Sequence, residues 1–282
     1  MNPLKILIPT DFSIQSEYAY VLIKKLEEKL PVEVHFIHIL NTPDSISIDD
    51  NGNITTCGDI APDFVKKHYD IAAQKFEELK KRIDGNIHIH IRSGKLTEGI
   101  ISFAEKNQFN LIAMGTKGIE GLRDKLGGTE TQLVARKSKV PVLSLSCDRS
   151  HLEIKNILFV HDFLADEQFD ISLMKHISDA FQCTIHLLHI LTSRTGQQIA
   201  DKVKANMEKF AAENQLKNYL IHVLKDSDIE QGVYHFDQMH SMDIICIGTH
   251  GKGSLFYSSV TEKLINHMYK PLITFRMYER RS

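Results

Sequence analysis

The feature that most constrains the fold of this chain is an internal repeat of its apolar segments. LKILIPTDFS at the start resembles IKNILFVHDFL at residues 154–164, and the aligned acids, Asp11 and Asp162, are 151 positions apart. VHFIHIL and IHLLHIL, which contain His38 and His189, keep that offset. NLIAMGTKG matches DIICIGTHG, and KVPVLSL matches KPLITF. Because the four matches follow one order, we expect two copies of one structural unit.

The copies divide the chain into residues 1–147 and 153–282, joined by the short polar segment CDRSHLE. Residues 41–60 have no counterpart in the second copy, and ISIDDNGNITT within them alternates around Asn51–Gly52. This pattern predicts a β-hairpin. Two interpretations of the hairpin stay open: a cover over a site or partner surface, or a decorated surface loop.

Short apolar runs alternate with amphipathic stretches in each copy. KILIP, EVHFIHIL, NIHIHIR, NLIAMG and PVLSLS have the length and residue types of strands, and SEYAYVLIKKLEEKL is typical of the helical stretches between them. Such alternation predicts parallel strands with right-handed crossovers. The expected fold is α/β, with two tandem Rossmann-like units, each a five-stranded parallel sheet with helices on both faces.

Composition narrows the class of partner and the compartment. The formal net charge is −2, with no basic excess to favour nucleic acid. No window reaches the roughly 18 apolar residues of a membrane span, and the N-terminus lacks the layout of a signal peptide. We therefore expect a cytoplasmic protein with neither nucleic acid nor membrane as its partner.

A glycine-rich segment after the run NLIAMG is the strongest candidate for binding. Its spacing is G-x-x-G-x9-G-[ST], formed by Gly115, Gly118, Gly128 and Thr129. Glycine lets a phosphate approach backbone N–H groups, and the helix expected to begin at Thr129 offers free amides. Asp11 ends the first predicted strand, so it faces the same crevice at the switch point of the sheet. Thr129 also fits a capping box, which is compatible with anion binding.

These motifs, in this order, resemble the universal stress protein family. The resemblance rests on ILIPTDFS, FIHIL and MGTKG-x9-GT followed by PVL, and it covers both halves. The loop spacing resembles that of the ATP-binding branch. The resemblance implies an adenine nucleotide alpha hydrolase-like fold that binds ATP with Mg²⁺.

The resemblance also implies roles for single residues. Pro9, Thr10 and Asp11 would lie near the adenine and ribose, the main chain of Ile39 would meet the adenine edge, and Gly94 would line the crevice. The ribose and phosphates would be held by the loop residues Gly115, Gly118, Gly128 and Thr129.

The second copy departs from this pattern. Ser258 stands where the third glycine is expected, the loop is three residues shorter, and no glycine matches Gly94. A side chain at position 258 would obstruct a phosphate, so we predict a degenerate second site. His161, Asp162 and His250 are candidates there for a metal site or for a polar cluster that fills unused space. His88 and His90 are interpreted as residues of a sheet surface rather than ligands.

The sequence offers nucleotide recognition but no evident catalyst. G-x-S-x-G, H-E-x-x-H and kinase signatures are absent from it, and no residue is assigned a catalytic role. The leading hypothesis is therefore an ATP-binding regulatory protein of the stress response, with at most slow hydrolysis. The alternatives are a weak ATPase or adenylyl-transfer enzyme, and a scaffold or small-ligand or metal-binding protein that works through its second unit.

Assembly follows from the same resemblance. The resemblance implies that single-copy members of the family form dimers that pair through their last strands. PVLSLS and PLITFRMY are therefore expected to pair within this chain as a pseudo-dimer, which would cover two edge strands. Further homodimerisation and protein partners are left open.

Overall fold

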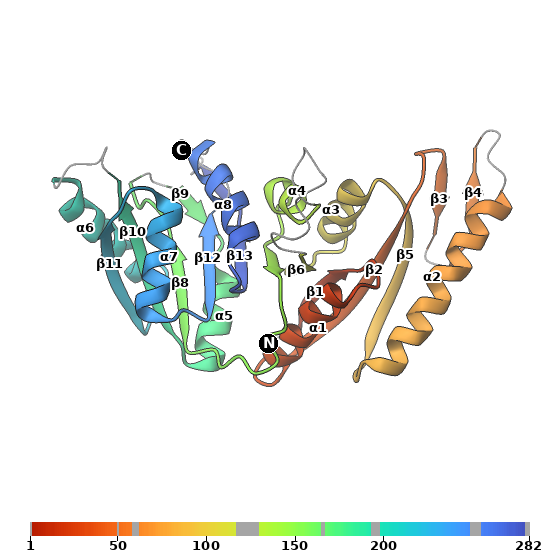
Figure 1. Ribbon diagram of the computed structural model, residues 1–282, viewed down its shortest axis with the longest axis horizontal. Helices are drawn as coiled ribbons and strands as arrows, with labels where there is room; N and C mark the ends of the chain where they lie inside the picture. The colour runs from red at the N-terminus through yellow and green to blue at the C-terminus, as the bar shows by residue number, and fades with distance from the viewer. Residues whose placement is uncertain are drawn as a thin grey trace.

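The computed structural model describes residues 2–49, 51–57, 62–116, 130–164, 167–192, 198–248 and 255–279. Ten strands form one continuous sheet across the molecule (Figure 1). The first half supplies β1 (Leu4–Pro9), β2 (Val32–Asn41), β5 (Ile87–Gly94), β6 (Leu111–Gly115) and β7 (Val142–Leu145). The second half supplies β8 (Asn156–Val160), β10 (Thr184–Leu191), β11 (Tyr219–Lys225), β12 (Ile244–Gly248) and β13 (Leu272–Phe275).

The strand order confirms the predicted fold class. It runs β5-β2-β1-β6-β7 in the first half and β11-β10-β8-β12-β13 in the second, with parallel pairing throughout each half. The halves meet where β7 pairs antiparallel with β13, and Leu143 lies opposite Ile273. We call this pairing the seam. The expected intrachain pairing of the last strands is therefore present.

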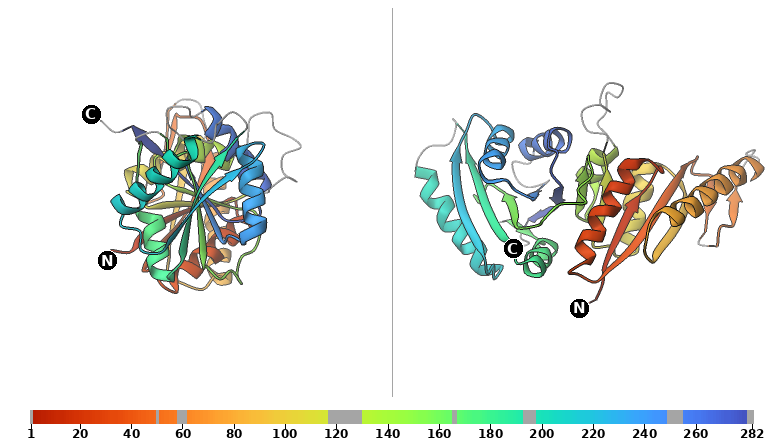
Figure 2. Two further views of the ribbon diagram at one scale, coloured as in Figure 1. Left: turned by 90° about the vertical axis from the view of Figure 1, so that its left-hand side faces the viewer. Right: turned by 60° about the horizontal axis from the view of Figure 1, so that its bottom comes forward.

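Helices cover both faces of the sheet, as Figure 2 shows. One face carries α1 (Ile14–Glu27), α2 (Pro62–Arg82), α5 (Ser172–Phe181) and α6 (Gln198–Glu213). The other carries α3 (Leu96–Lys106), α4 (Glu130–Lys137), α7 (Ile229–His240) and α8 (Leu255–His267). Buried side chains on each face form one apolar layer that runs through both halves. The halves therefore share their cores as well as their sheet.

The predicted hairpin is present at one end of the molecule. β3 (Ile46–Ile48) pairs antiparallel with β4 (Ile54–Thr56), and the hairpin lies beside β5 and α2 (Figure 1). Ile46 and Ile48 are buried, and the Ser93 hydroxyl donates to the Ile46 carbonyl oxygen at 3.0 Å. The hairpin is thus packed onto the carboxyl end of β5, next to Gly94.

The strand expected from PLITFRMY is interrupted at Arg276. β13 ends at Phe275, and β14 (Met277–Glu279) pairs with β9 (Glu167–Phe169) in a separate two-stranded sheet. The Arg276 guanidinium donates to the Lys137 carbonyl oxygen at 3.4 Å, across the seam. The last segment therefore contributes to two sheets rather than one.

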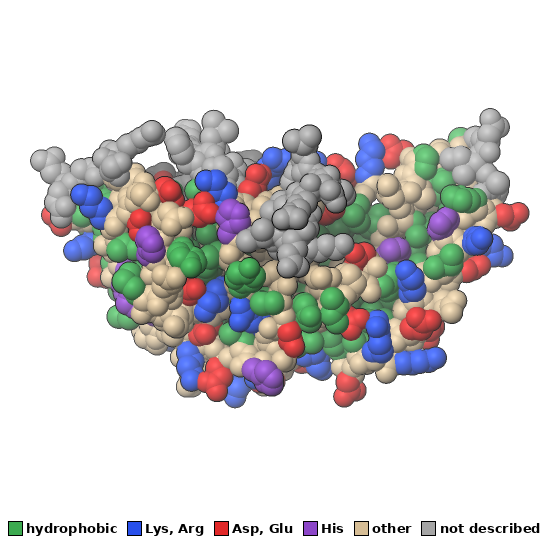
Figure 3. All heavy atoms as spheres, in the orientation of Figure 1, with side chains coloured by type: hydrophobic (Ala, Val, Ile, Leu, Met, Phe, Trp, Pro, Cys, Tyr) green, Lys and Arg blue, Asp and Glu red, His purple; other side chains and the backbone are tan. Residues whose placement is uncertain are grey.

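The face drawn in Figure 3 shows no dominant charge. On this face, Lys and Arg side chains are interspersed with Asp and Glu. Within the described ranges, none of the helices combines the length and the apolar character needed to cross a bilayer.

A pair of histidines is repeated in both halves on the α3 and α7 face. His35 Nδ1 lies 2.9 Å from His90 Nε2, and His186 Nδ1 lies 3.1 Å from His222 Nε2. Burial, together with the neighbouring His186 and His240, lowers the pKa of His222 to about 4. His222 is therefore neutral in the folded protein at neutral pH.

This lowered pKa predicts a loss of stability in acid. An unfolded histidine gains its proton near pH 6.5, whereas folded His222 gains it near pH 4, so acid favours the unfolded chain over this range. Above pH 6.5 both forms are neutral and the contribution vanishes. We expect the urea midpoint to fall between pH 6.5 and 4, and to fall less steeply in His222→Gln. Equal slopes for the two proteins would contradict the assignment to His222.

Candidate functional site: the crevice beyond β1 and β6

The segment after β1 is a hydrogen-bonded loop that presents Asp11. Thr10 is buried, and its hydroxyl accepts from the Phe12 N–H at 2.8 Å and lies 2.9 Å from Ser16 Oγ. Phe12 has a φ of 65°, which turns the chain sharply into α1. Asp11 is exposed, and its Oδ1 accepts from the Ser13 N–H at 3.0 Å. The loop therefore uses Thr10 internally and places the Asp11 carboxylate at the surface.

His38 holds this loop against β2. Its Nδ1 lies 2.8 Å from the Thr10 carbonyl oxygen, and Phe12 packs on its ring with centroids 4.8 Å apart. Burial lowers the pKa of His38, so the ring is neutral and Nδ1 is the donor in this bond. His38 therefore positions the Asp11 loop through this hydrogen bond and the contact with Phe12.

Gly115 ends β6 directly beside this loop. β1 and β6 are neighbours at the switch point, and extending their register from Leu7 and Ile112 places Thr10 beside Gly115. A Cβ at Gly115 would overlap the backbone carbonyl of Gln15, at the start of α1. The absence of a side chain at Gly115 is thus required by helix packing. Its predicted contact with nucleotide stays a prediction.

Thr116, the next residue, was not singled out from the sequence. Its side chain is buried at 6% exposure, and within the described ranges its Oγ1 has no hydrogen-bond partner. Leaving a buried hydroxyl unpaired costs about 1–3 kcal/mol. Such an atom at the carboxyl end of a switch-point strand is the strongest indication of a polar ligand here. The only sign of Thr116 in the sequence is its position directly after Gly115, at the start of the glycine-rich segment.

Ile39 and Gly94 border the opening from the other side. Ile37 accepts from the Thr10 N–H at 2.9 Å, and backbone groups two residues apart in a strand point the same way. The N–H and C=O of Ile39 therefore point past Pro9, the end of β1, toward the crevice. Gly94 has a φ of 125°, and space is open where its Cβ would lie. These positions agree with the expected contacts without testing them.

The remaining predicted residues, Gly118, Gly128 and Thr129, lie outside the described residues. The adjoining helix is described from Glu130, whose carboxylate accepts from the buried Thr97 hydroxyl of α3. A positive charge also lies near the loop, because Lys75 Nζ of α2 is 5.2 Å from the centre of the Phe12 ring. Sequence reasoning missed Lys75, which is 63 residues from Phe12 in the chain.

The second half builds the same loop with a different residue. The Phe163 N–H donates to His161 Nδ1 at 2.9 Å, as the Phe12 N–H donates to Thr10 in the first half. His189 repeats the role of His38, with its Nδ1 3.4 Å from the His161 carbonyl oxygen. The replacement of Thr10 by His161 therefore preserves the loop.

The metal candidates in the second half are only partly described. His161 Nε2 lies 3.7 Å from Asp162 Oδ1, whereas His250 lies outside the described residues. Because His161 Nδ1 accepts a backbone hydrogen bond, a neutral ring carries its proton on Nε2. That tautomer disfavours metal ligation, and the polar-cluster alternative fits the described atoms better.

The second half has an acidic residue, Asp226, at the position where the first half has Gly94. Asp226 follows β11 as Gly94 ends β5, and its Oδ2 lies 2.7 Å from His235 Nδ1. The hydrogen bond with His235 is the main cause that lowers the pKa of Asp226, so the carboxylate is charged at neutral pH. Asp162 has its counterpart in Asp11, so Asp226 is the acid that distinguishes the second half from the first. The described residues thus favour an anionic ligand in the first half.

Comparison with known proteins gives a consistent result. The sequence profile of the universal stress protein family matches residues 4–145. Universal stress protein MJ0531 of Methanocaldococcus jannaschii is 27% identical over 139 residues, covering 49% of this chain and 79% of that protein. Universal stress protein MJ0577 of the same organism is 28% identical over 149 residues, covering 49% and 92%.

A solved structure shows the same architecture over both halves. The crystal structure of a universal stress protein from Archaeoglobus fulgidus matches with a TM-score of 0.72 and 20% identity. The match covers 96% of this chain and 98% of that protein. At this identity the likeness shows the fold alone.

Proposed function

Because the chain belongs to the universal stress protein family, we propose that its first half binds ATP with Mg²⁺ and serves as a nucleotide-dependent regulator of the stress response. The observation that carries this proposal is the buried Thr116 hydroxyl, which has no partner in the described part of the chain and directly follows the carboxyl end of β6. A ligand that supplies an acceptor or donor there would relieve its desolvation cost.

The crevice residues offer suitable groups for the ribose, the adenine and the phosphates of a nucleotide. Asp11 offers a carboxylate for ribose hydroxyls, and the main chain of Ile39 offers donor and acceptor groups for an adenine edge. Thr116 offers its hydroxyl close to the glycine loop, where we place the phosphates and Mg²⁺. The metal would neutralise phosphate charge when bound. We assign ATP binding to residues 1–147 and expect the second crevice, with Asp162 and Asp226, to bind none.

Binding, rather than turnover, is the proposed activity. Phosphoryl transfer needs a group that orients the attacking atom and groups that stabilise the transferring charge. The Asp11 carboxylate is proposed to bind ribose, which leaves it poorly placed as a general base. We therefore expect slow hydrolysis or none.

The test is calorimetric titration of nucleotide-free protein with ATP and Mg²⁺. We expect one ATP per chain and no detectable binding to Gly128→Val, because a side chain there would block the approach of phosphate to the backbone. Thr116→Val, which is nearly isosteric, is expected to weaken binding about 10-fold, or ~1.4 kcal/mol, while the folded protein without ligand keeps or gains stability.

Ser258→Val is the matched control, since it changes the corresponding loop of the second half. It is expected to leave the affinity and the stoichiometry unchanged. Absence of ATP binding in the unmodified protein would refute the proposal. Rapid hydrolysis of bound ATP would instead replace the regulator with an ATPase.

A further inference from the structure

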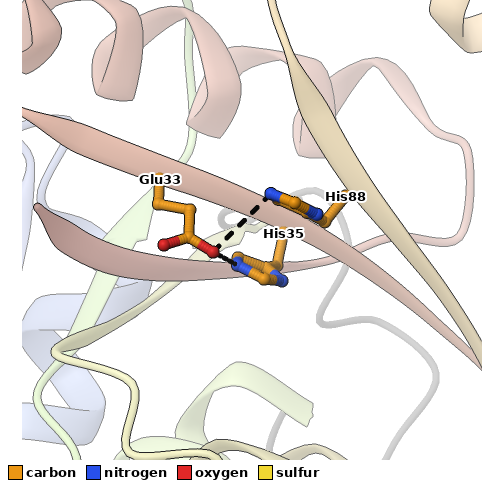
Figure 4. Close-up of side chains that lie close together, drawn as sticks. All are labelled: Glu33, His35 and His88. Atoms are coloured by element: carbon orange, nitrogen blue, oxygen red, sulfur yellow. Dashed lines mark hydrogen bonds and ion pairs between the residues drawn. The ribbon is translucent and has the colours of Figure 1, made fainter.

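A second group of polar side chains lies at the opposite end of the same strands. Glu33 and His35 are near the start of β2, and His88 is the second residue of β5. All three lie on the sheet face that α3 covers, and Figure 4 shows the Glu33 carboxylate directed toward both imidazole rings. Parallel strands carry the nucleotide crevice at their carboxyl ends, so this group is separate from it.

The distances within the group approach those of a metal site. Glu33 Oε1 lies 2.7 Å from His35 Nε2 and 3.6 Å from His88 Nε2, and the three atoms all lie within 4.8 Å of one another. Tetrahedral ligands at zinc distances of 2.0–2.2 Å are roughly 3.4 Å apart. Shifts of about an ångström or less in these side chains would therefore admit an ion.

Neighbouring groups orient the buried ligand. His35 Nδ1 lies 2.9 Å from His90 Nε2, and the Phe109 ring packs perpendicular to the His35 ring with centroids 4.9 Å apart. With its Nδ1 proton donated to His90, His35 would present an unprotonated Nε2 to an ion, as metal-bound histidines commonly do. The side chains of His88 and Glu33 are 48% and 34% exposed, which leaves room for water as a further ligand.

Comparison with the second half shows which residues of this group are explained by packing alone. It repeats the inner pair as His186 and His222, but Leu220 lies beside His186 where His88 lies beside His35. Thr184 takes the place of Glu33. The histidine pair is thus common to both halves, whereas the carboxylate and the outer imidazole occur together in the first half.

We propose that Glu33, His35 and His88 bind one divalent cation of the zinc class, with water completing the coordination. Two imidazoles and one carboxylate suit Zn²⁺ and disfavour Mg²⁺, which prefers oxygen ligands. The ion would tie β5, the last strand of the sheet, to β2. The positive charge of Lys5 disfavours binding of a cation here, because the ammonium lies near the group, 5.0 Å from the centre of the Phe109 ring.

The test titrates the chelator-treated full-length chain with ZnCl₂ by calorimetry, and with Co²⁺ to record the visible spectrum of the bound ion. We expect one ion per chain with the spectrum of a tetrahedral nitrogen and oxygen site. Glu33→Gln and His88→Ala are each expected to lower the affinity at least 10-fold and to abolish that spectrum. Lys5→Met is expected to raise the affinity.

His267→Ala is the matched control, because His267 of α8 is 50% exposed and its Nδ1 lies 2.8 Å from the Glu230 carboxylate of α7. It is expected to keep the affinity of the unmodified chain. Zinc binding that survives both Glu33→Gln and His88→Ala, or is absent from the unmodified chain, would overturn the proposal. Circular dichroism of each variant without metal, expected to match the unmodified chain, separates ligand loss from misfolding.

Discussion

Replacing Gly115 with alanine is expected to lower the free energy of unfolding by about 3 kcal/mol. The new Cβ would overlap the backbone carbonyl of Gln15, and a backbone atom cannot turn away as a side chain can. The start of α1 would have to move off the sheet and carry the Asp11 loop with it. Urea unfolding followed by circular dichroism measures the loss, and calorimetry should show weakened ATP binding in the same variant.

Gly99→Ala is the control for this prediction. The atoms nearest to a Cβ at Gly99 would be those of the Ile39 side chain, with Cδ1 at 3.2 Å, and alanine favours helix by up to about 1 kcal/mol over glycine. We expect little net change in stability. Equal destabilisation by the two substitutions would show that the contact with Gln15 is not the cause.

Ile273→Ala is expected to cost about 2–5 kcal/mol, since it opens a cavity in the seam. Ile273 is 2% exposed, lies opposite Leu143 and belongs to the apolar layer shared by the halves. Ile273→Val removes one methylene and should cost about 0.5–1.5 kcal/mol. Because that layer continues through both halves, we expect them to unfold together in the unmodified chain.

Protection of β7 and of β13 distinguishes the outcomes for Ile273→Ala. Hydrogen exchange resolved by residue is expected to show lowered protection in β7 as well as in β13. Loss confined to the second half, with β7 fully protected, would mean that the halves are independent cores that merely touch.

The repeat predicted the fold well, because it rests on local apolar patterns that occur twice. The ends of β1 and β6 could be placed from Asp11 and Gly115 by a rule about parallel sheets, and the hairpin from Asn51–Gly52. These inferences need only short segments and their order. They do not depend on which side chains are in contact in the folded protein.

The contacts that decide the sites were harder to predict, since they join distant segments. Gly115 is predicted from the sequence to contact phosphate, and this stays a prediction. Its overlap with the Gln15 carbonyl, 100 residues earlier, could not be predicted from the sequence. His88 was read as a residue of the sheet surface, and its exposure agrees. Its approach to Glu33 depends on the register of β2 and β5, which hydrophobic patterning leaves undetermined.

The seam between β7 and β13 has a consequence for how this protein can carry a signal. In a pair of separate chains, association depends on their concentration, and a ligand can act by shifting that equilibrium. Here the segment from Cys147 to Glu153 keeps the two partners covalently joined, so dilution does not part them. ATP bound as proposed would therefore not act by changing whether these two halves associate. It would act through the shape or the exposed surface of the joined pair.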